Sequence, residues 1–77
     1  MIYTFLDGRA YIAPNPLALV RQLRKSSYAL YDTDEEYMEA FNERAMDMLG
    51  VPLNTDSAKD FVESLIDNGI VAVSQLN

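Results

Sequence analysis

The sequence predicts a single α+β domain in which an N-terminal β-hairpin packs against three amphipathic helices. Three observations predict it: an Asp-Gly turn between two β-rich runs, three segments with helical spacing of apolar residues, and a capping residue before each of those segments. No internal repeat or linker divides the 77 residues, so we expect one domain over residues 1–77. A short apolar run over residues 70–73 leaves open a third strand beside the hairpin.

The hairpin is expected within residues 2–12, IYTFLDGRAYI. Asp7-Gly8 suits the two-residue loop of a type I′ turn, because both central residues of that turn need positive φ. Such a loop pairs Phe5 with Ala10 and Tyr3 with Ile12. It puts Tyr3, Phe5, Ala10 and Ile12 on one side of the ribbon, and Ile2, Leu6 and Tyr11 on the other. Both sides are apolar, so at least one requires a helix over it.

The first helix is expected to begin at Pro16, with Asn15 as its N-cap. Its apolar residues gather on one side of the helix, and its basic residues Arg21, Arg24 and Lys25 lie on the other. Two interpretations of the basic residues stay open. They complement the helix dipole and solvate one face, or they form a contact site for an anion.

The second helix is expected over residues 34–49, where Thr33 and Glu36 have capping-box spacing and Gly50 provides the end. Its apolar stripe contains six residues: Tyr37, Met38, Phe41, Ala45, Met48 and Leu49. Met46 is an apolar residue on the polar side.

The third helix is expected to begin after Thr55 or Ser57, either of which can cap it, and to end at Asn68-Gly69. Ile70 then stands where a Schellman motif makes its apolar contact. The predicted core stripe of this helix contains Ala58, Phe61, Val62, Leu65 and Ile66.

Four acidic residues lie opposite the apolar stripe on each of the second and third helices. The first acidic row is Glu36, Glu39, Glu43 and Asp47, and the second acidic row is Asp56, Asp60, Glu63 and Asp67. Acids on an outer face keep a small protein soluble, which is the simplest interpretation. However, like charges at i,i+4 destabilise a helix slightly, and lysine would serve equally well as a helix former. The absence of any base from both rows therefore suggests a partner-binding role.

Composition excludes several classes of function. A net charge of −6 disfavours direct binding to nucleic acid or to an anionic membrane. With no histidine, no cysteine and no glycine-rich loop, we expect no catalytic residue, no cofactor and no enzymatic activity. The segment DTDEE has the first acids of a calcium loop but lacks its glycine and distal glutamate, so no metal site is expected. Residues 1–9 lack the features of a signal peptide, and a cytoplasmic protein is expected.

In size, acidity and its two acidic rows, the chain resembles the small acidic proteins of phages and mobile elements, among them anti-CRISPR proteins. The resemblance implies a compact non-catalytic inhibitor that blocks its target by binding, in some members by DNA mimicry. That class shares no motif, so no residue role is transferred from it. The expected partner is a protein, in the narrower form a nucleic-acid-binding protein whose basic groove accepts the two acidic rows.

A second interpretation is an interaction or scaffolding module, or a small homodimer, in which the acidic rows serve solubility alone. Its candidate interface residues are Tyr28, Tyr31 and Met46. Core packing is the expected fate of two or three of the five tyrosines, since a small core needs large side chains.

Overall fold

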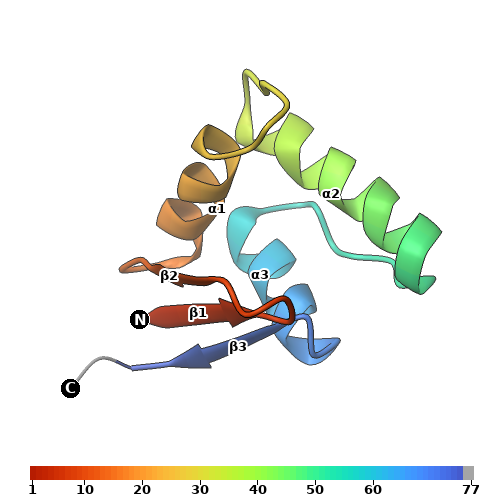
Figure 1. The fold of residues 1–77 in the computed structure, drawn as a ribbon. Coiled ribbons are helices and arrows are strands. Elements are labelled where there is room, and N and C mark those ends of the chain that lie inside the picture. The colour runs from red at the N-terminus through yellow and green to blue at the C-terminus, as the bar shows by residue number, and fades with distance from the viewer. Residues whose placement is uncertain (76–77) are drawn as a thin grey trace.

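The computed structural model describes residues 1–75 of the chain. The elements follow the order β1 (Ile2–Phe5), β2 (Ala10–Ile12), α1 (Pro16–Lys25), α2 (Asp34–Leu49), α3 (Ala58–Asp67) and β3 (Val71–Ser74). β1 is the central strand of an antiparallel sheet with the order β2-β1-β3. α1 and α3 lie over the sheet, and α2 packs on the side of these two helices (Figure 1). The predicted α+β class is confirmed, and the C-terminal strand that the sequence left open is present.

The hairpin turn is one residue longer than predicted. The Phe5 N–H donates to the Arg9 carbonyl at 2.8 Å, and the Gly8 N–H donates to the Phe5 carbonyl at 2.9 Å. The loop is therefore residues 6–8, and φ is 91° at Gly8, which glycine adopts without the steric cost of a Cβ. This loop pairs Tyr3 with Tyr11. The predicted pairing of Tyr3 with Ile12 is thus wrong, as is that of Phe5 with Ala10.

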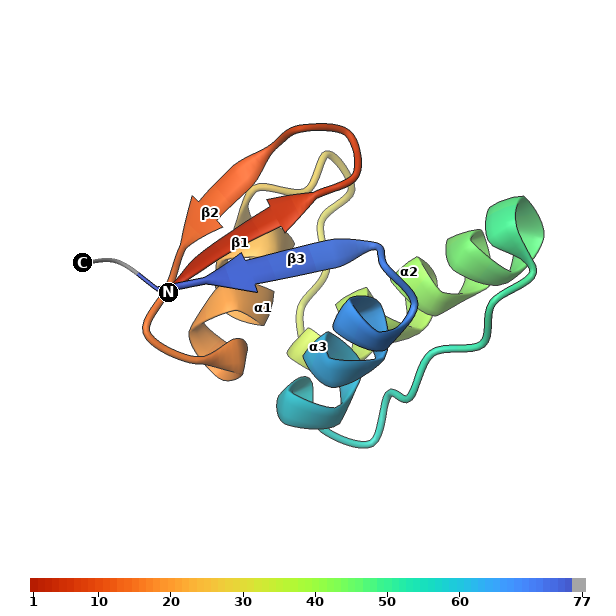
Figure 2. The same cartoon turned by 90° about the horizontal axis from the view of Figure 1, so that it is seen from below.

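The corrected register puts the aromatic side chains of the hairpin on the side of the helices. Tyr3 and Phe5 are buried there, and the Phe5 and Tyr11 rings meet edge-on with centroids 5.6 Å apart. On the opposite face Ile12 is 62% exposed, and none of the helices within residues 1–75 covers that side of the sheet (Figure 2). Tyr3 and Phe5 share one side in either register, so the observed register places Tyr11 beside them in place of Ala10 and Ile12. The edge-on contact of the Tyr11 and Phe5 rings favours this register.

The predicted N-caps Asn15 and Thr33 are confirmed. Of the two candidates for the third helix, Ser57 is the N-cap and Thr55 is not. The side chains of Asn15, Thr33 and Ser57 each accept a hydrogen bond from the backbone N–H three residues later, at 2.9, 3.1 and 3.1 Å. Each bond satisfies one of the four N–H groups that a helix start leaves without a partner.

The turn from α3 into β3 is a Schellman motif. The Ile70 N–H donates to the Leu65 carbonyl at 2.9 Å, and the Gly69 N–H donates to the Ile66 carbonyl at 3.0 Å. Gly69 has a φ of 71°, the left-handed conformation that this motif requires. Ile70 is buried as predicted. Because Ile70 belongs to the turn, β3 begins one residue later than the sequence suggested.

One cluster of buried side chains joins the sheet to the helices. α1 contributes Leu19, Val20 and Leu23, and α3 contributes Phe61, Val62 and Leu65. These residues belong to the stripes predicted for the two helices. The predicted fate of the tyrosines is also confirmed, since Tyr3 and Tyr37 are buried.

The stripe predicted for α2 is confirmed only over its first three turns. Tyr37, Met38 and Ala45 are buried, whereas Met48 is 80% and Leu49 is 55% exposed. α2 has 16 residues, and α1 and α3 have 10 each. The last turn of α2 therefore extends past the helices that would cover it (Figure 1). The prediction that Met48 and Leu49 belong to the core is wrong.

Candidate partner-binding surfaces

The first acidic row forms a continuous line along the outer side of α2. Glu36, Glu39, Glu43 and Asp47 are all exposed. They project from the side of the helix opposite Tyr37, Met38 and Ala45, which face the core. The burial of those three residues fixes the rotation of α2, and this rotation holds the four carboxylates in water.

Three acids of the second acidic row, Asp60, Glu63 and Asp67, have the same relation to α3, whereas Asp56 precedes the N-cap Ser57 and lies outside the helix, contrary to the prediction. Asp56, Glu63 and Asp67 are exposed, and Asp60 is half-buried. Asp60 lies in the first turn of the helix, where its backbone N–H donates to the Ser57 hydroxyl at 3.1 Å. A carboxylate at this position also interacts favourably with the helix dipole. Asp60 thus stabilises the start of α3, whereas the other three acids of the row have no such contact.

None of the eight row carboxylates forms an ion pair with another described residue. Over residues 1–75, salt bridges join Arg9 to Asp7, and Arg21 and Arg24 to Asp34. Arg44 and Lys59 stand on the same helices as the rows but form no ion pair within that range. The negative charge of both rows is therefore not neutralised by an ion pair within residues 1–75.

The two rows do not run at a fixed spacing from each other. α2 and α3 start side by side, where the Phe41 and Phe61 rings meet edge-on at 5.6 Å. The helices then separate toward their C-terminal ends (Figures 1 and 2). One row carries four charges over about three helical turns, or about one per 5 Å. Duplex DNA carries one per 1.7 Å of its axis. Neither row alone has the charge density of a duplex.

Known proteins offer no relative to guide the assignment. No protein-family model matches the chain, and no curated protein or solved structure is similar to it. None of the helices within residues 1–75 has the length and the apolar character needed to cross a membrane.

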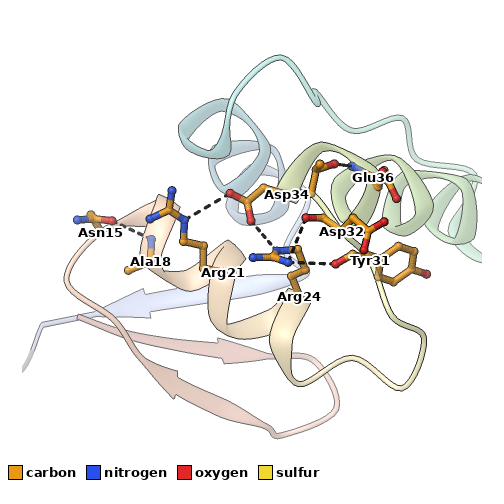
Figure 3. Close-up of polar contacts among 9 residues, drawn as sticks. Asn15, Ala18, Arg21, Arg24, Tyr31, Asp32, Asp34 and Glu36 are labelled. Carbon is orange, nitrogen blue, oxygen red and sulfur yellow. Dashed lines mark hydrogen bonds and ion pairs between the residues drawn. The ribbon is translucent and has the colours of Figure 1, made fainter.

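The basic residues of α1 have a structural role that neither sequence-based interpretation anticipated. Arg24 donates from Nε to Asp34 Oδ1 at 2.9 Å and from Nη1 to the Tyr31 carbonyl at 3.0 Å (Figure 3). Arg21 Nε lies 3.5 Å from the other oxygen of Asp34. These hydrogen bonds connect the end of α1 to the start of α2, which are separated by a connector of eight residues. The pairing is not visible in the sequence because Arg24 and Asp34 belong to different helices.

Removing this carboxylate is expected to destabilise the fold. The side chains of Arg24 and Asp34 are 21% and 17% exposed, so the contact is partly shielded from water. Asp34→Ala should lower the free energy of unfolding by about 1 to 3 kcal/mol, since it removes a charged hydrogen bond and an acid at a helix start. Urea denaturation measures the loss. Asp32→Ala is the control, because Asp32 contributes only its carbonyl to Arg24. Equal losses in both variants would contradict the assigned role of Asp34.

The secondary interface candidates have different environments. Tyr28 is fully exposed, together with its neighbour Leu30. Tyr31 is half-buried, and its ring packs edge-on against Tyr37 with centroids 5.7 Å apart. Met46 is exposed and stands in the same last turns of α2 as Met48 and Leu49. The structure thus offers two apolar surfaces, one at the connector after α1 and one at the end of α2.

Because Tyr37 is buried, the free energy of unfolding is expected to fall at alkaline pH. Burial raises the pKa of its phenol to about 12 from an ordinary value of 10, and the positive charge of Arg44 opposes the rise. The folded state thus favours the protonated phenol, so this contribution is fully present below pH 10 and is lost as pH rises toward 12.

This dependence predicts a difference between the wild type and Tyr37→Phe. Between pH 10 and 12 the wild type should lose up to about 2 to 3 kcal/mol of unfolding free energy relative to the variant, which has no phenol to ionise. Urea denaturation of both proteins at pH 8, 10 and 11 measures the difference. Parallel stability curves over that range would show that Tyr37 is not buried as described.

Proposed function

We propose that this protein is a non-enzymatic binding domain that attaches to a basic surface of a partner protein through the acidic rows of α2 and α3. The observation that carries the proposal is that all eight carboxylates lack an ion-pair partner within residues 1–75, and that seven of them are exposed. A partner with lysines and arginines would supply the missing counter-charges.

The arrangement of the acids supports this role over simple solubility. Glu39 and Glu43 on α2, and likewise Glu63 and Asp67 on α3, stand at i,i+4, where like charges repel. A lysine at one position of each pair would replace this repulsion with attraction and keep the helix propensity. The two rows forgo this stabilisation at all eight positions, which fits a surface selected for its electrostatic potential.

In its narrower form, the proposal makes the protein an inhibitor of a nucleic-acid-handling protein, as the resemblance to anti-CRISPR proteins implies. A single row has a lower charge density than duplex DNA. A DNA-binding partner therefore has to contact both rows if it is to bind this protein as it binds DNA. This form predicts direct competition, because the inhibitor and the nucleic acid occupy the same groove.

The test begins by capturing partners on the immobilised protein and identifying them by mass spectrometry. A 20-base-pair DNA duplex is then added to the purified complex. The proposal predicts that the duplex displaces the partner, while a peptide nucleic acid of the same sequence, whose backbone is uncharged, does not. A partner that stays bound at saturating duplex would exclude nucleic-acid mimicry and leave only the broader proposal. A partner surface without excess positive charge would exclude both.

The apolar end of α2 supports a second candidate, an interaction module or homodimer that uses Met46, Met48 and Leu49. Met48 and Leu49 end the apolar stripe of α2 and are exposed, and Met46 is exposed on the other side of the same turn. Exposed apolar side chains of this kind are what interfaces bury. This candidate predicts self-association or partner binding that salt leaves unchanged and that Met48→Glu abolishes. Analytical ultracentrifugation at two salt concentrations distinguishes it from the proposal above.

A further inference from the structure

A cavity of about 510 Å³ opens between the hairpin turn, the connector after α1 and the middle of α2. Its volume falls within the range of small-molecule sites. No pattern in the sequence indicates it. The cavity forms where three segments distant in the chain meet, so its position depends on tertiary packing alone.

The inner wall of the cavity is aromatic. Phe5, Tyr11, Tyr37 and Phe41 all line it. Their rings are held by contacts with one another: Phe5 meets Tyr11 edge-on at 5.6 Å, and Tyr37 lies at a tilt to Phe41 at 6.2 Å. Phe5 and Tyr37 are buried in the core, so this wall is rigid. Fixed rings favour a flat apolar ligand that packs on them.

The rim of the cavity carries two arginines. Arg9 uses its Nε to bind Asp7 at 2.8 Å, and its two terminal nitrogens have no partner within residues 1–75. The Arg44 guanidinium lies 5.7 Å from the centre of the Phe41 ring and forms no ion pair within that range. With Asp7 also on the rim, the lining carries one net positive charge in a protein whose net charge is −6. The cavity is thus suited to an anion although the protein as a whole repels anions.

Hydroxyl groups add neutral donors. Tyr37 and Tyr11 line the cavity, and neither hydroxyl forms a hydrogen bond to another side chain or to the backbone within residues 1–75. Because burial raises the pKa of Tyr37 to about 12, its phenol is protonated near neutral pH and can donate. An aromatic wall, two guanidinium groups and phenol donors therefore converge on one space.

We propose that this cavity binds a small organic anion with a flat aromatic body, whose ring packs against the aromatic wall while its acid group pairs with Arg44 and Arg9. Aryl carboxylates and nucleoside phosphates share this chemistry. The site is separate from the acidic rows, since Arg44 projects toward the core side of α2 with Phe41. Its existence does not depend on the proposed partner protein.

Matched pairs of ligands test the proposal on the ¹⁵N-labelled protein by NMR. Indole-3-acetate is compared with the neutral indole-3-acetamide, and adenosine monophosphate with adenosine. We expect at least one of the two anions to shift the amide signals of Arg9, Tyr11, Ser27, Phe41 and Arg44, and to bind about tenfold more tightly than its neutral counterpart. The anion that binds identifies the source of the ligand.

Substitutions locate the charge that the anion recognises. Arg44→Gln should abolish the preference for the anion, and Arg9→Gln should reduce it, while the dispersed spectrum of each variant verifies its fold. Lys59→Gln, which removes an exposed cation of α3 outside the cavity, should leave the preference unchanged. Three results would overturn the proposal: no shift from either anion at 10 mM (about the weakest affinity of interest), equal affinity for anion and neutral analogue, or an equal effect of Lys59→Gln.

Discussion

Alanine in place of Phe61 is expected to lower the free energy of unfolding by about 3 to 5 kcal/mol. Phe61 is 0% exposed, and its ring meets Phe41 edge-on at 5.6 Å, so it joins α3 to α2 within the core. Truncation leaves a cavity that the neighbouring rings cannot fill. A 77-residue domain has a total stability of about 4 to 12 kcal/mol, so this one change should remove at least about a quarter of it.

Met48→Ala is the control for this prediction. The helical pattern of the sequence assigns Met48 to the core as firmly as it assigns Phe61, but the structure leaves Met48 80% exposed. Its replacement should change stability by no more than about 0.5 kcal/mol. Urea denaturation followed by circular dichroism measures both variants. A loss above about 2 kcal/mol for Met48→Ala would mean that the end of α2 is covered, which contradicts the described fold.

Reversing charges in the first acidic row is expected to weaken partner binding by about 30- to 100-fold. Glu39→Lys with Glu43→Lys removes two attractive charges and adds two repulsive ones in the middle of the row, at a cost of about 2 to 3 kcal/mol. Both side chains are exposed and unpaired within residues 1–75, so the fold should be unaffected. Glu63→Lys with Asp67→Lys tests the second row in the same way. Isothermal titration calorimetry with the captured partner measures each affinity.

A matched variant separates the position of the charges from their number. Asp32→Lys with Glu35→Lys gives the same net charge of −2 as either row variant, but it changes two exposed acids outside both rows. We expect less than about a threefold loss of affinity from this control. A loss as large as that of the row variants would mean that the partner responds to net charge, and the rows would then have no specific role.

Local features of this fold could be predicted from the sequence. Asn15 and Thr33 cap their helices, and Gly69 ends α3, because each acts on backbone groups no more than a few residues away. The acidic rows were predictable for the same reason, since residues three and four apart share one side of a helix.

Features that depend on the length of a loop or helix, or on packing between segments distant in the chain, could not be predicted. Asp7-Gly8 is compatible with loops of two or three residues, and the choice is made by the burial of Tyr11 against Phe5. A helical pattern shows which side of α2 carries Met48. It does not show whether α1 and α3 are long enough to cover that side chain. The bond between Arg24 and Asp34 and the cavity beside Arg44 both join segments that only the tertiary fold brings together.

The cavity bears on the non-enzymatic proposal as well. Its lining contains one group with a large pKa shift, the Tyr37 phenol, and burial is the main cause of that shift. Acid–base catalysis uses paired groups whose pKa values are driven apart toward the working pH. A phenol that stays protonated to about pH 12 is instead a stable hydrogen-bond donor, which is consistent with binding.

The salt dependence of partner affinity tests most directly whether an unpaired anionic surface does the binding. The measurement is calorimetric titration of the captured partner from 50 to 300 mM NaCl, with the wild type and with the Glu39→Lys, Glu43→Lys variant. Salt screens exposed charges over about 10 Å, so the wild-type affinity should fall at least about tenfold, and the variant should show a shallower fall. A wild-type affinity that changes by less than about twofold over this range would contradict the account.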